Sequence, residues 1–205
     1  MKKSLFLAVG ALSLWMGVAR ADGNAELIQR SYDSEATGRL ADSLSVLDQL
    51  SAPRRDAYVV TLRKAWLLYR LGRYAESTEV YVRAIALAPA AVEPRLGILL
   101  PYLALRRWSD VENQARAILK LEPGNYLATL RLAFACYNLQ RYAESTALYR
   151  KLIDLYPGDV EVRGGLGWAL LKLGKYPEAS AEFRNILEIA PRNELAKEGL
   201  KATGG

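Results

Sequence analysis

Apolar and aromatic residues recur in this chain at a spacing suited to ligand binding. Leu62, Trp66 and Tyr69 stand at positions i, i+4 and i+7, which share one face of an α-helix. The same offsets recur every 34 residues, as Leu96, Leu100 and Leu103, then Leu130, Phe134 and Tyr137, then Gly164, Trp168 and Leu171. Large exposed apolar patches usually mark interaction sites, and aromatic residues are favoured anchors of protein interfaces. The stripe therefore predicts a protein-binding surface.

Basic residues accompany the stripe at Arg63, Arg70, Arg131 and Lys172. They could pair with acidic flanks of an apolar ligand, and ordinary solvated helix charges explain them equally well. The predicted partner is another protein, which contributes an amphipathic helix or an extended apolar segment. The residues expected to bind the partner are Leu62, Arg63, Trp66, Tyr69, Arg70, Leu96, Leu100, Leu103, Leu130, Arg131, Phe134, Tyr137, Trp168 and Leu171.

The remaining residue types exclude most catalytic chemistry. The chain has no histidine and one cysteine, Cys136, so it lacks a histidine-dependent triad, a histidine or multi-cysteine zinc site and an internal disulfide. The best carboxylate pair, Glu93 and Glu161, lies two repeats apart, and helices packed at 8–10 Å would separate the two by roughly 20 Å. Glycosidase pairs need about 5–9.5 Å. We therefore expect no enzyme activity, no cofactor and no metal.

The charge balance does not favour nucleic acid as a partner. The chain has 28 basic and 22 acidic residues, for a formal net charge of +6. Three of the basic residues, Lys2, Lys3 and Arg20, lie in the first 21 residues, which contain no acid. After residue 21 the chain has 25 basic and 22 acidic residues, an excess of only three positive charges. Nucleic-acid-binding proteins show a pronounced, clustered basic surface instead.

Two further series with the same period indicate the elements that position the stripe. Aromatic residues stand at Tyr74, Trp108, Tyr142 and Tyr176, and prolines follow fifteen residues after each, at Pro89, Pro123, Pro157 and Pro191. A fixed period of this size is typical of a repeat array in which each unit stacks on its neighbours. Apolar runs of helical length, separated by turn residues, predict two helices in each repeat. We expect the aromatic series to lie inside the stack.

The pattern resembles the tetratricopeptide repeat family. The resemblance rests on the period and on two sets of residues: Gly72, Tyr74, Ser77, Tyr81, Ala84 and Pro89, and Gly174, Tyr176, Ala179, Phe183 and Pro191. Arg106 and Gln140 replace the turn glycine in two repeats. The resemblance implies an all-α fold, a right-handed superhelical solenoid of antiparallel helix pairs. It also implies that the first helix of each pair, which carries the stripe, lines a concave groove.

The chain divides along this period. We expect a degenerate first repeat at residues 22–57, full repeats at 58–91, 92–125, 126–159 and 160–193, and a capping helix and tail at 194–205. Residues 1–21 read as a secretory signal, with two lysines, an uncharged apolar run and small residues before a cleavage site at Ala21. An uncleaved anchor is the alternative, but the run of fifteen residues is shorter than the roughly 20 that a spanning helix needs. A periplasmic or secreted protein with no membrane span after cleavage is predicted.

Together these patterns predict a non-catalytic interaction scaffold or adaptor of the cell envelope. The alternative is a self-assembling structural protein, whose groove docks another copy of the chain. Two other fates of the stripe remain open: a tightly wound superhelix could bury part of it, or the degenerate first repeat could fold into it.

Overall fold

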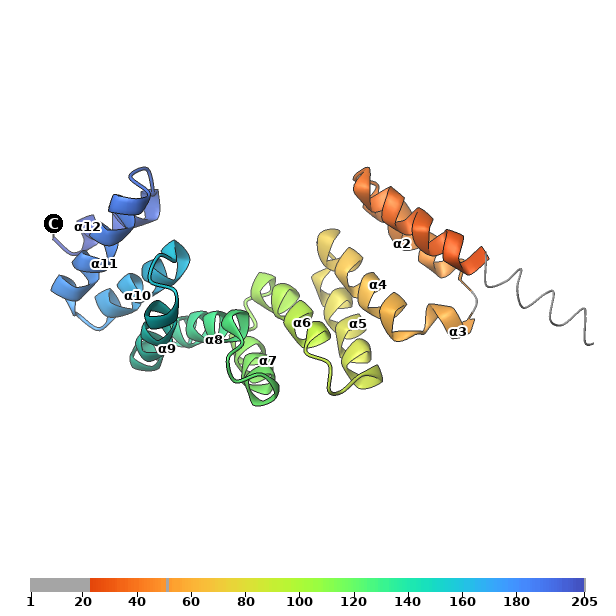
Figure 1. The fold of residues 1–205 in the computed structure, drawn as a ribbon, viewed down its shortest axis with the longest axis horizontal. Helices are drawn as coiled ribbons and strands as arrows, with labels where there is room; N and C mark the ends of the chain where they lie inside the picture. The colour runs from red at the N-terminus through yellow and green to blue at the C-terminus, as the bar shows by residue number, and fades with distance from the viewer. Residues whose placement is uncertain (1–22, 51, 205) are drawn as a thin grey trace, which may run out of the picture. The chain divides into compact units, whose positions relative to one another are not determined.

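The computed structural model describes residues 23–50 and 52–204. The predicted signal segment lies outside the described residues. All regular secondary structure in the described ranges is helical (Figure 1). A helix over residues 23–36 comes first. It is followed by α2 (Leu40–Asp48), α3 (Ala52–Arg55), α4 (Tyr58–Arg70), α5 (Tyr74–Leu87), α6 (Glu93–Ala104), α7 (Trp108–Leu121), α8 (Tyr126–Asn138), α9 (Tyr142–Leu155), α10 (Val160–Lys172), α11 (Tyr176–Ile189) and α12 (Glu194–Ala202).

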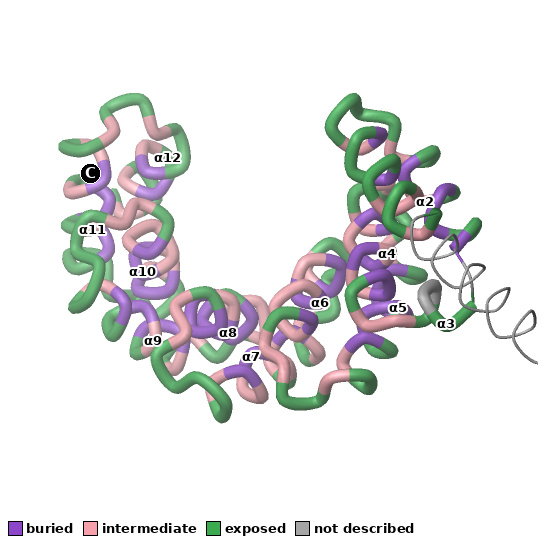
Figure 2. The backbone as a smooth tube through the Cα atoms, turned by 45° about the vertical axis from the view of Figure 1, so that its right-hand side comes forward, coloured by how far each residue is buried: buried purple, intermediate pink, exposed green. Residues whose placement is uncertain are grey.

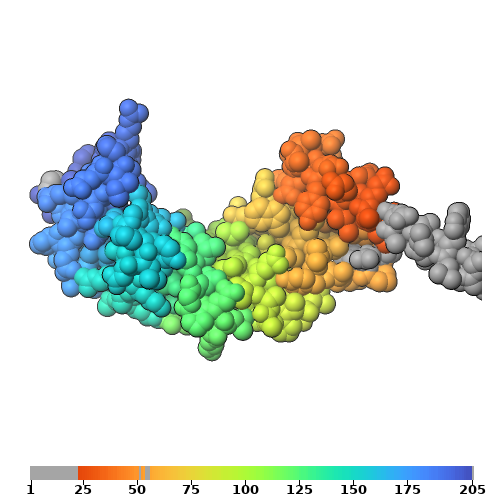
Figure 3. All heavy atoms as spheres, viewed as in Figure 1, coloured from red at the N-terminus to blue at the C-terminus, as the bar shows by residue number. Residues whose placement is uncertain are grey.

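The described part of the chain forms two compact units, which divide between Pro89 and Ala90. In the first unit, α4 packs against α5; in the second, α6 packs against α7, α8 against α9 and α10 against α11. Each helix of the second unit packs mainly on the helices that precede and follow it in the chain. In a space-filling view coloured by residue number, the colours of this unit therefore follow one another in order (Figure 3). Buried residues recur along α8 and α10, where these helices meet their neighbours (Figure 2). The predicted all-α solenoid of consecutive helix pairs is confirmed.

One buried hydrogen bond recurs in three helix pairs. A serine near the start of the second helix donates its hydroxyl to a carbonyl oxygen twelve residues earlier, on the first helix. The bonds run from Ser77 to Ala65 (2.8 Å), from Ser145 to Ala133 (2.9 Å) and from Ser43 to Ser31 (2.7 Å). Because the third bond joins α2 to the helix over residues 23–36, these two helices form a pair of the same kind as the others.

The turn inside each repeat uses the left-handed backbone region. Gly72 and Gly174 have φ of 75° and 73°, a conformation that glycine adopts without a side-chain clash. Arg106 and Gln140 occupy the same position with φ of 54° and 62°. The turn geometry is therefore kept where the glycine is missing, at the expense of some backbone strain.

The aromatic series at the start of the second helices is less buried than predicted. Tyr74, Trp108 and Tyr142 are half-buried, and Tyr176 is 51% exposed. These residues begin their helices, so packed neighbours cover only part of each ring. Two turns further along, Tyr81, Tyr149 and Phe183 are 2%, 3% and 0% exposed. They supply the large buried rings of the core instead.

No helix in residues 23–50 and 52–204 has both the length and the apolar character needed to cross a bilayer.

Candidate functional site

A cavity of about 560 Å³ lies in the second unit, between α8, α10 and the start of α12. Its volume falls within the range of about 300–1,000 Å³ that is usual for ligand pockets. Residues of α9 and α11 contribute to its floor. The lining residues are Leu130, Phe134, Tyr137, Tyr149, Val160, Glu161, Gly164, Gly165, Trp168, Phe183, Ile186, Asn193, Leu195 and Ala196.

Two adjacent glycines of α10 shape this cavity. A β-carbon on Gly164 would have Ile186 as its nearest neighbour, at 3.9 Å, so the glycine leaves open space above that side chain. A β-carbon on Gly165 would lie 2.2 Å from the ring of Tyr149. Gly164 therefore keeps the cavity open, and Gly165 lets the Tyr149 ring pack beneath the helix.

Contacts between rings hold the aromatic side chains of the cavity. Trp168 packs edge-on against the buried Phe183, with ring centroids 5.4 Å apart. Tyr137 packs in the same way against Tyr142 at 5.5 Å. Phe134 contacts Trp108 at 5.7 Å. Each wall residue is thus fixed by an aromatic partner on a second helix, which lowers the entropic cost of presenting it to a ligand.

The polar groups of the cavity are few and mostly engaged. Glu161 forms an ion pair of 2.8 Å with Arg131, and the side chain of Asn193 caps α12 by accepting from the Ala196 amide. Burial raises the pKa of the Tyr137 phenol and that of the Tyr149 phenol, so both remain neutral near pH 7. This lining offers apolar contact and is poorly suited to acid–base chemistry.

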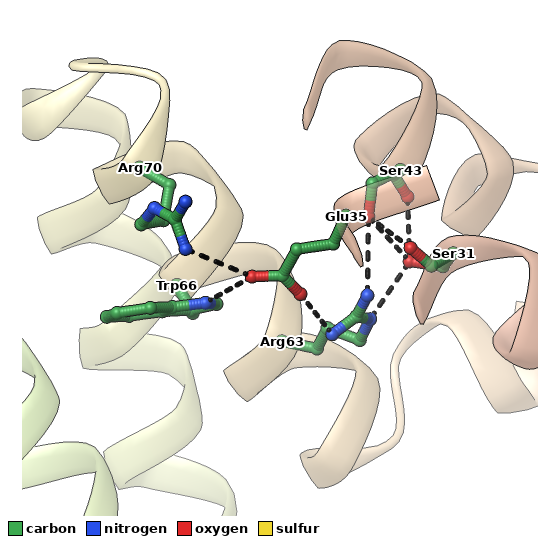
Figure 4. A network of polar contacts seen from close by, with 6 residues as sticks. All are labelled: Ser31, Glu35, Ser43, Arg63, Trp66 and Arg70. Carbon is green, nitrogen blue, oxygen red and sulfur yellow. Dashed lines mark hydrogen bonds and ion pairs between the residues drawn. The ribbon is translucent and has the colours of Figure 1, made fainter. Parts of the chain in front are cut away.

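We call the contact between the first helices of two consecutive repeats a seam. In the first unit, the seam between the helix over residues 23–36 and α4 corresponds by repeat position to the seam between α8 and α10. There, Glu35 of the helix over residues 23–36 reaches across to α4 (Figure 4). Its carboxylate accepts from Trp66 Nε1 at 2.8 Å and from Arg63 Nη1 at 2.9 Å. Arg70 Nη1 lies 3.4 Å from the same carboxylate. The carboxylate of Glu35 therefore contacts three side chains of α4.

The guanidinium of Arg63 is enclosed on its other sides as well. Its Nε donates to Ser31 Oγ at 2.9 Å, and its Nη2 donates to Ser43 Oγ at 3.3 Å. The group also lies 3.5 Å from the centroid of the Tyr32 ring. Only 7% of the Arg63 side chain is exposed. We call this set of contacts around Glu35 and Arg63 the Glu35 network.

Comparison with known sequences identifies the repeat. Models of the tetratricopeptide repeat match residues 62–90, 101–160 and 139–202, which together make up more than half of the chain. The chain belongs to the tetratricopeptide repeat family. Comparison with curated proteins gives no match.

Several solved structures share the fold. A tetratricopeptide repeat protein from Parabacteroides merdae ATCC 43184 is 20% identical, with a TM-score of 0.79, over 89% of this chain and 72% of that one. MamA (41-end) from Desulfovibrio magneticus RS-1 is 16% identical, with a TM-score of 0.78, over 84% and 97%. A structure titled MamA AMB-1 is 20% identical, with a TM-score of 0.68, over 81% and 98%. At these identities the likeness concerns the fold alone.

The structure gathers only some of the predicted groove residues into the cavity. Four of them line it: Leu130, Phe134, Tyr137 and Trp168. Leu130 does so from the core, since it is 2% exposed. Arg131 is engaged by Glu161. Four others are half-buried on the same unit without lining the cavity: Leu96, Leu100 and Leu103 on α6, and Leu171 on α10.

The predicted groove residues on α4 lie outside the cavity, and most contact the first repeat or one another. Arg63 was expected to orient a ligand, but it is buried and bonded to three residues of the first repeat. Trp66 and Arg70 also contact Glu35. Tyr69 packs between Trp66 and Tyr74, and Leu62 is half-buried. The first repeat thus uses part of this face for its own packing, one of the outcomes that the sequence left open.

Sequence reasoning missed Glu35 and the residues that form the cavity floor. Glu35 stands one 34-residue period before Tyr69, so extending the stripe back by one repeat would have placed it on this face. Tyr149 and Phe183 are likewise one period apart. This spacing predicts that they share a position in their repeats but not that they form the floor of a cavity. Asn193 continues a series with Asn125 and Asp159 at the same period, and each of the three caps the helix that follows it. Leu195 gave no consistent signal, since Glu161 and Leu127 stand one and two periods before it.

Proposed function

We propose that this tetratricopeptide repeat chain is a non-catalytic interaction scaffold, and that its second unit holds an apolar or amphipathic segment of a partner protein. The cavity beside α10 is the observation that carries the proposal. It places Phe134, Tyr137 and Trp168 around a hollow of about 560 Å³. Aromatic side chains around a pocket are the usual anchors of protein recognition, whereas the fold by itself assigns no function.

The chemistry of the lining favours a protein segment over a small polar ligand. Sites for small molecules fix their ligands with a few well-placed polar groups. Here, the carboxylate of Glu161 is paired with Arg131, and Asn193 is used as a helix cap. A segment with one apolar face fills such a cavity and keeps its own polar backbone groups bonded, as an amphipathic helix does.

Filling the cavity tests the proposal directly. Peptides are first selected from a random phage-displayed library on the full chain. The substitution Gly164→Leu then introduces the side chain that the second repeat carries at the same position, Leu62. We expect the affinity of the selected peptides to fall by about tenfold to a hundredfold, the equivalent of one lost apolar anchor, with helical circular dichroism unchanged.

The matched control is Gly124→Leu, in a loop where a β-carbon meets no atom within 4 Å. This variant should bind the selected peptides like the unmodified chain. A library that yields no binding peptide, or peptides indifferent to Gly164→Leu, would show that the cavity is not the binding site.

A second copy of the chain is the competing occupant. Sedimentation over a wide concentration range separates the two cases, because a scaffold for other proteins should remain monomeric. Association that grows with concentration and disappears in Gly164→Leu would identify the ligand as the chain itself.

We further propose that the chain acts in the cell envelope after cleavage behind Ala21. The support is the composition of the first 21 residues. Expression in a Gram-negative host, followed by fractionation and intact-mass measurement, tests this. We expect a periplasmic product that begins at Asp22; a membrane-bound product of full mass would favour the anchor instead.

A further inference from the structure

The Glu35 network and the cavity occupy corresponding seams, which makes them a matched comparison. Trp66 and Trp168 are related by three 34-residue periods, and so are Arg70 and Lys172. The position of Glu35 corresponds to Tyr137. The tryptophan and the cation that follows it by one turn are thus present in both seams, but the carboxylate that contacts both of them is present only in the first.

The two groups left without this carboxylate remain accessible. Among the described residues, the indole nitrogen of Trp168 has no hydrogen-bond acceptor, and it is not among the buried polar atoms that lack a partner. Lys172 is exposed and forms no ion pair with any described residue. The other charges of this seam, Arg131 and Glu161, neutralise each other. The seam between α8 and α10 therefore has one unbalanced positive charge beside a free N–H donor.

On these grounds we infer that the partner segment carries an aspartate or glutamate that takes the place of Glu35. Its carboxylate would accept from Trp168 Nε1, as Glu35 accepts from Trp66 Nε1, and would pair with Lys172. This inference rests on the proposed function and adds the chemistry of the ligand to it. The cavity supplies the apolar contact, and the acid supplies orientation along α10.

Helix geometry sets the distance between the two features of the ligand. Gly164, Trp168 and Lys172 follow one another at intervals of four residues on α10, so they lie on one face. At 1.5 Å per residue, the acid-binding pair begins about 6 Å and ends about 12 Å from the hollow at Gly164. In a helical ligand that runs along α10, the acid is expected four to eight residues from the apolar side chain that fills the hollow.

Selection from the same random peptide library tests the inference. Peptides selected on the unmodified chain should be enriched in a bulky apolar residue and an acid at this separation. Against Trp168→Phe and against Lys172→Gln, the enrichment in the acid should weaken while the apolar residue persists. For one selected peptide, replacing its acid by the amide should lower affinity about tenfold, the usual effect of losing a charge-assisted hydrogen bond. That loss should shrink in Trp168→Phe.

The matched control is Trp66→Phe, which removes the same N–H where Glu35 already accepts it. It should leave peptide selection unchanged. Selected peptides that need an open Gly164 but carry no acid would overturn this inference and leave the proposed function standing. A library without binders would overturn both. Decanoate that binds more tightly than every selected peptide would show that the acid belongs to a small amphiphile and not to a protein.

Discussion

Two seams of this chain, the one at Glu35 and the one between α8 and α10, share a tryptophan and a cation at the same repeat positions but differ in the residues around them. In the first, Glu35 joins a buried arginine and a tryptophan, and two serines complete the contacts. Between α8 and α10, Gly164 and Gly165 stand at the positions of a leucine and of Arg63, a tyrosine replaces the acid, and a cavity remains. Periodicity thus assigns a residue to a face of the stack, whereas the neighbours across the seam decide whether that face is packed or open.

The Glu35 network also shows why a terminal repeat tolerates a buried ion pair. Removing two charges from water costs free energy that their attraction does not always recover. Here, each charge has several hydrogen-bond partners, and the partners come from three different helices. Such a network specifies how the degenerate first repeat docks onto α4, which apolar contacts of lower directionality would define less sharply.

The largest effect should come from Phe183, which packs against Trp168 and beneath Gly167 of α10 and Gly199 of α12. Phe183→Ala should lower the unfolding free energy of the second unit by about 3–5 kcal/mol, as truncations of buried aromatic residues do.

Burial raises the pKa of the Cys136 thiol to about 11, so this thiol should be inert to a maleimide near pH 7. In Phe183→Ala the labelling of Cys136 should accelerate, while amide exchange in residues 23–50 stays as before.

The next effect compares the two ion pairs directly. Glu35→Ala leaves Arg63 buried without its counter-charge and should destabilise the first unit by about 3 kcal/mol, at the low end of the range for broken buried pairs because 18% of the Glu35 side chain is exposed. Glu161→Ala breaks a pair whose acid is 60% exposed and should cost below about 1 kcal/mol. Chemical unfolding followed by hydrogen exchange in each unit checks both values. Equal losses would contradict the contrast between a structural and an accessible seam.

A smaller effect is expected at Tyr142, which supports Tyr137 at the cavity wall. Because Tyr142 is half-buried, Tyr142→Ala should cost about 2 kcal/mol, less than a fully buried ring. Its equivalent Tyr74→Ala should cost a similar amount in the first unit. A loss as large as that of Phe183→Ala would mean that the ring is a core residue after all.

The smallest effect concerns the turn at Gln140. A residue other than glycine in the left-handed region carries about 1–2 kcal/mol of strain, part of which glycine gives back as chain entropy in the unfolded state. Gln140→Gly should therefore stabilise the second unit by up to about 1 kcal/mol. The converse change Gly174→Gln should destabilise it by a comparable amount, and thermal unfolding measures both.

The helix pairs were predictable from the sequence because the period, the turn residues and the prolines are local signals that agree with one another. The placement of the stripe on the first helix of each pair, α4, α6, α8 and α10, follows from the same signals. The burial of Tyr74 and its equivalents was predicted wrongly, since periodicity reports that a residue is repeated but not how many neighbours surround it.

Local sequence signals could not predict which of the two seams is packed and which contains a cavity. The bond between Glu35 and Trp66 joins residues 31 positions apart and depends on the docking of two helices. The cavity depends on the side chain that is missing at Gly164, and the packing beneath it depends on the one missing at Gly165. Missing side chains give no signal in a search for functional groups. Only the packed structure shows that Tyr149 fills one of the two spaces and that nothing in the described chain fills the other.

The glycine pair of α10 has a consequence for how this protein can change over evolutionary time. At Gly165 any side chain would collide with Tyr149, so substitution there should damage the fold and be removed by selection. At Gly164 a side chain meets no obstacle within 3.9 Å, and it would improve helix propensity by about 0.5–1 kcal/mol. A single mutation at this position could therefore weaken the proposed ligand binding while making the protein more stable. Lineages that no longer need the partner should lose the site easily, and those that need it must retain a glycine that stability alone would not favour.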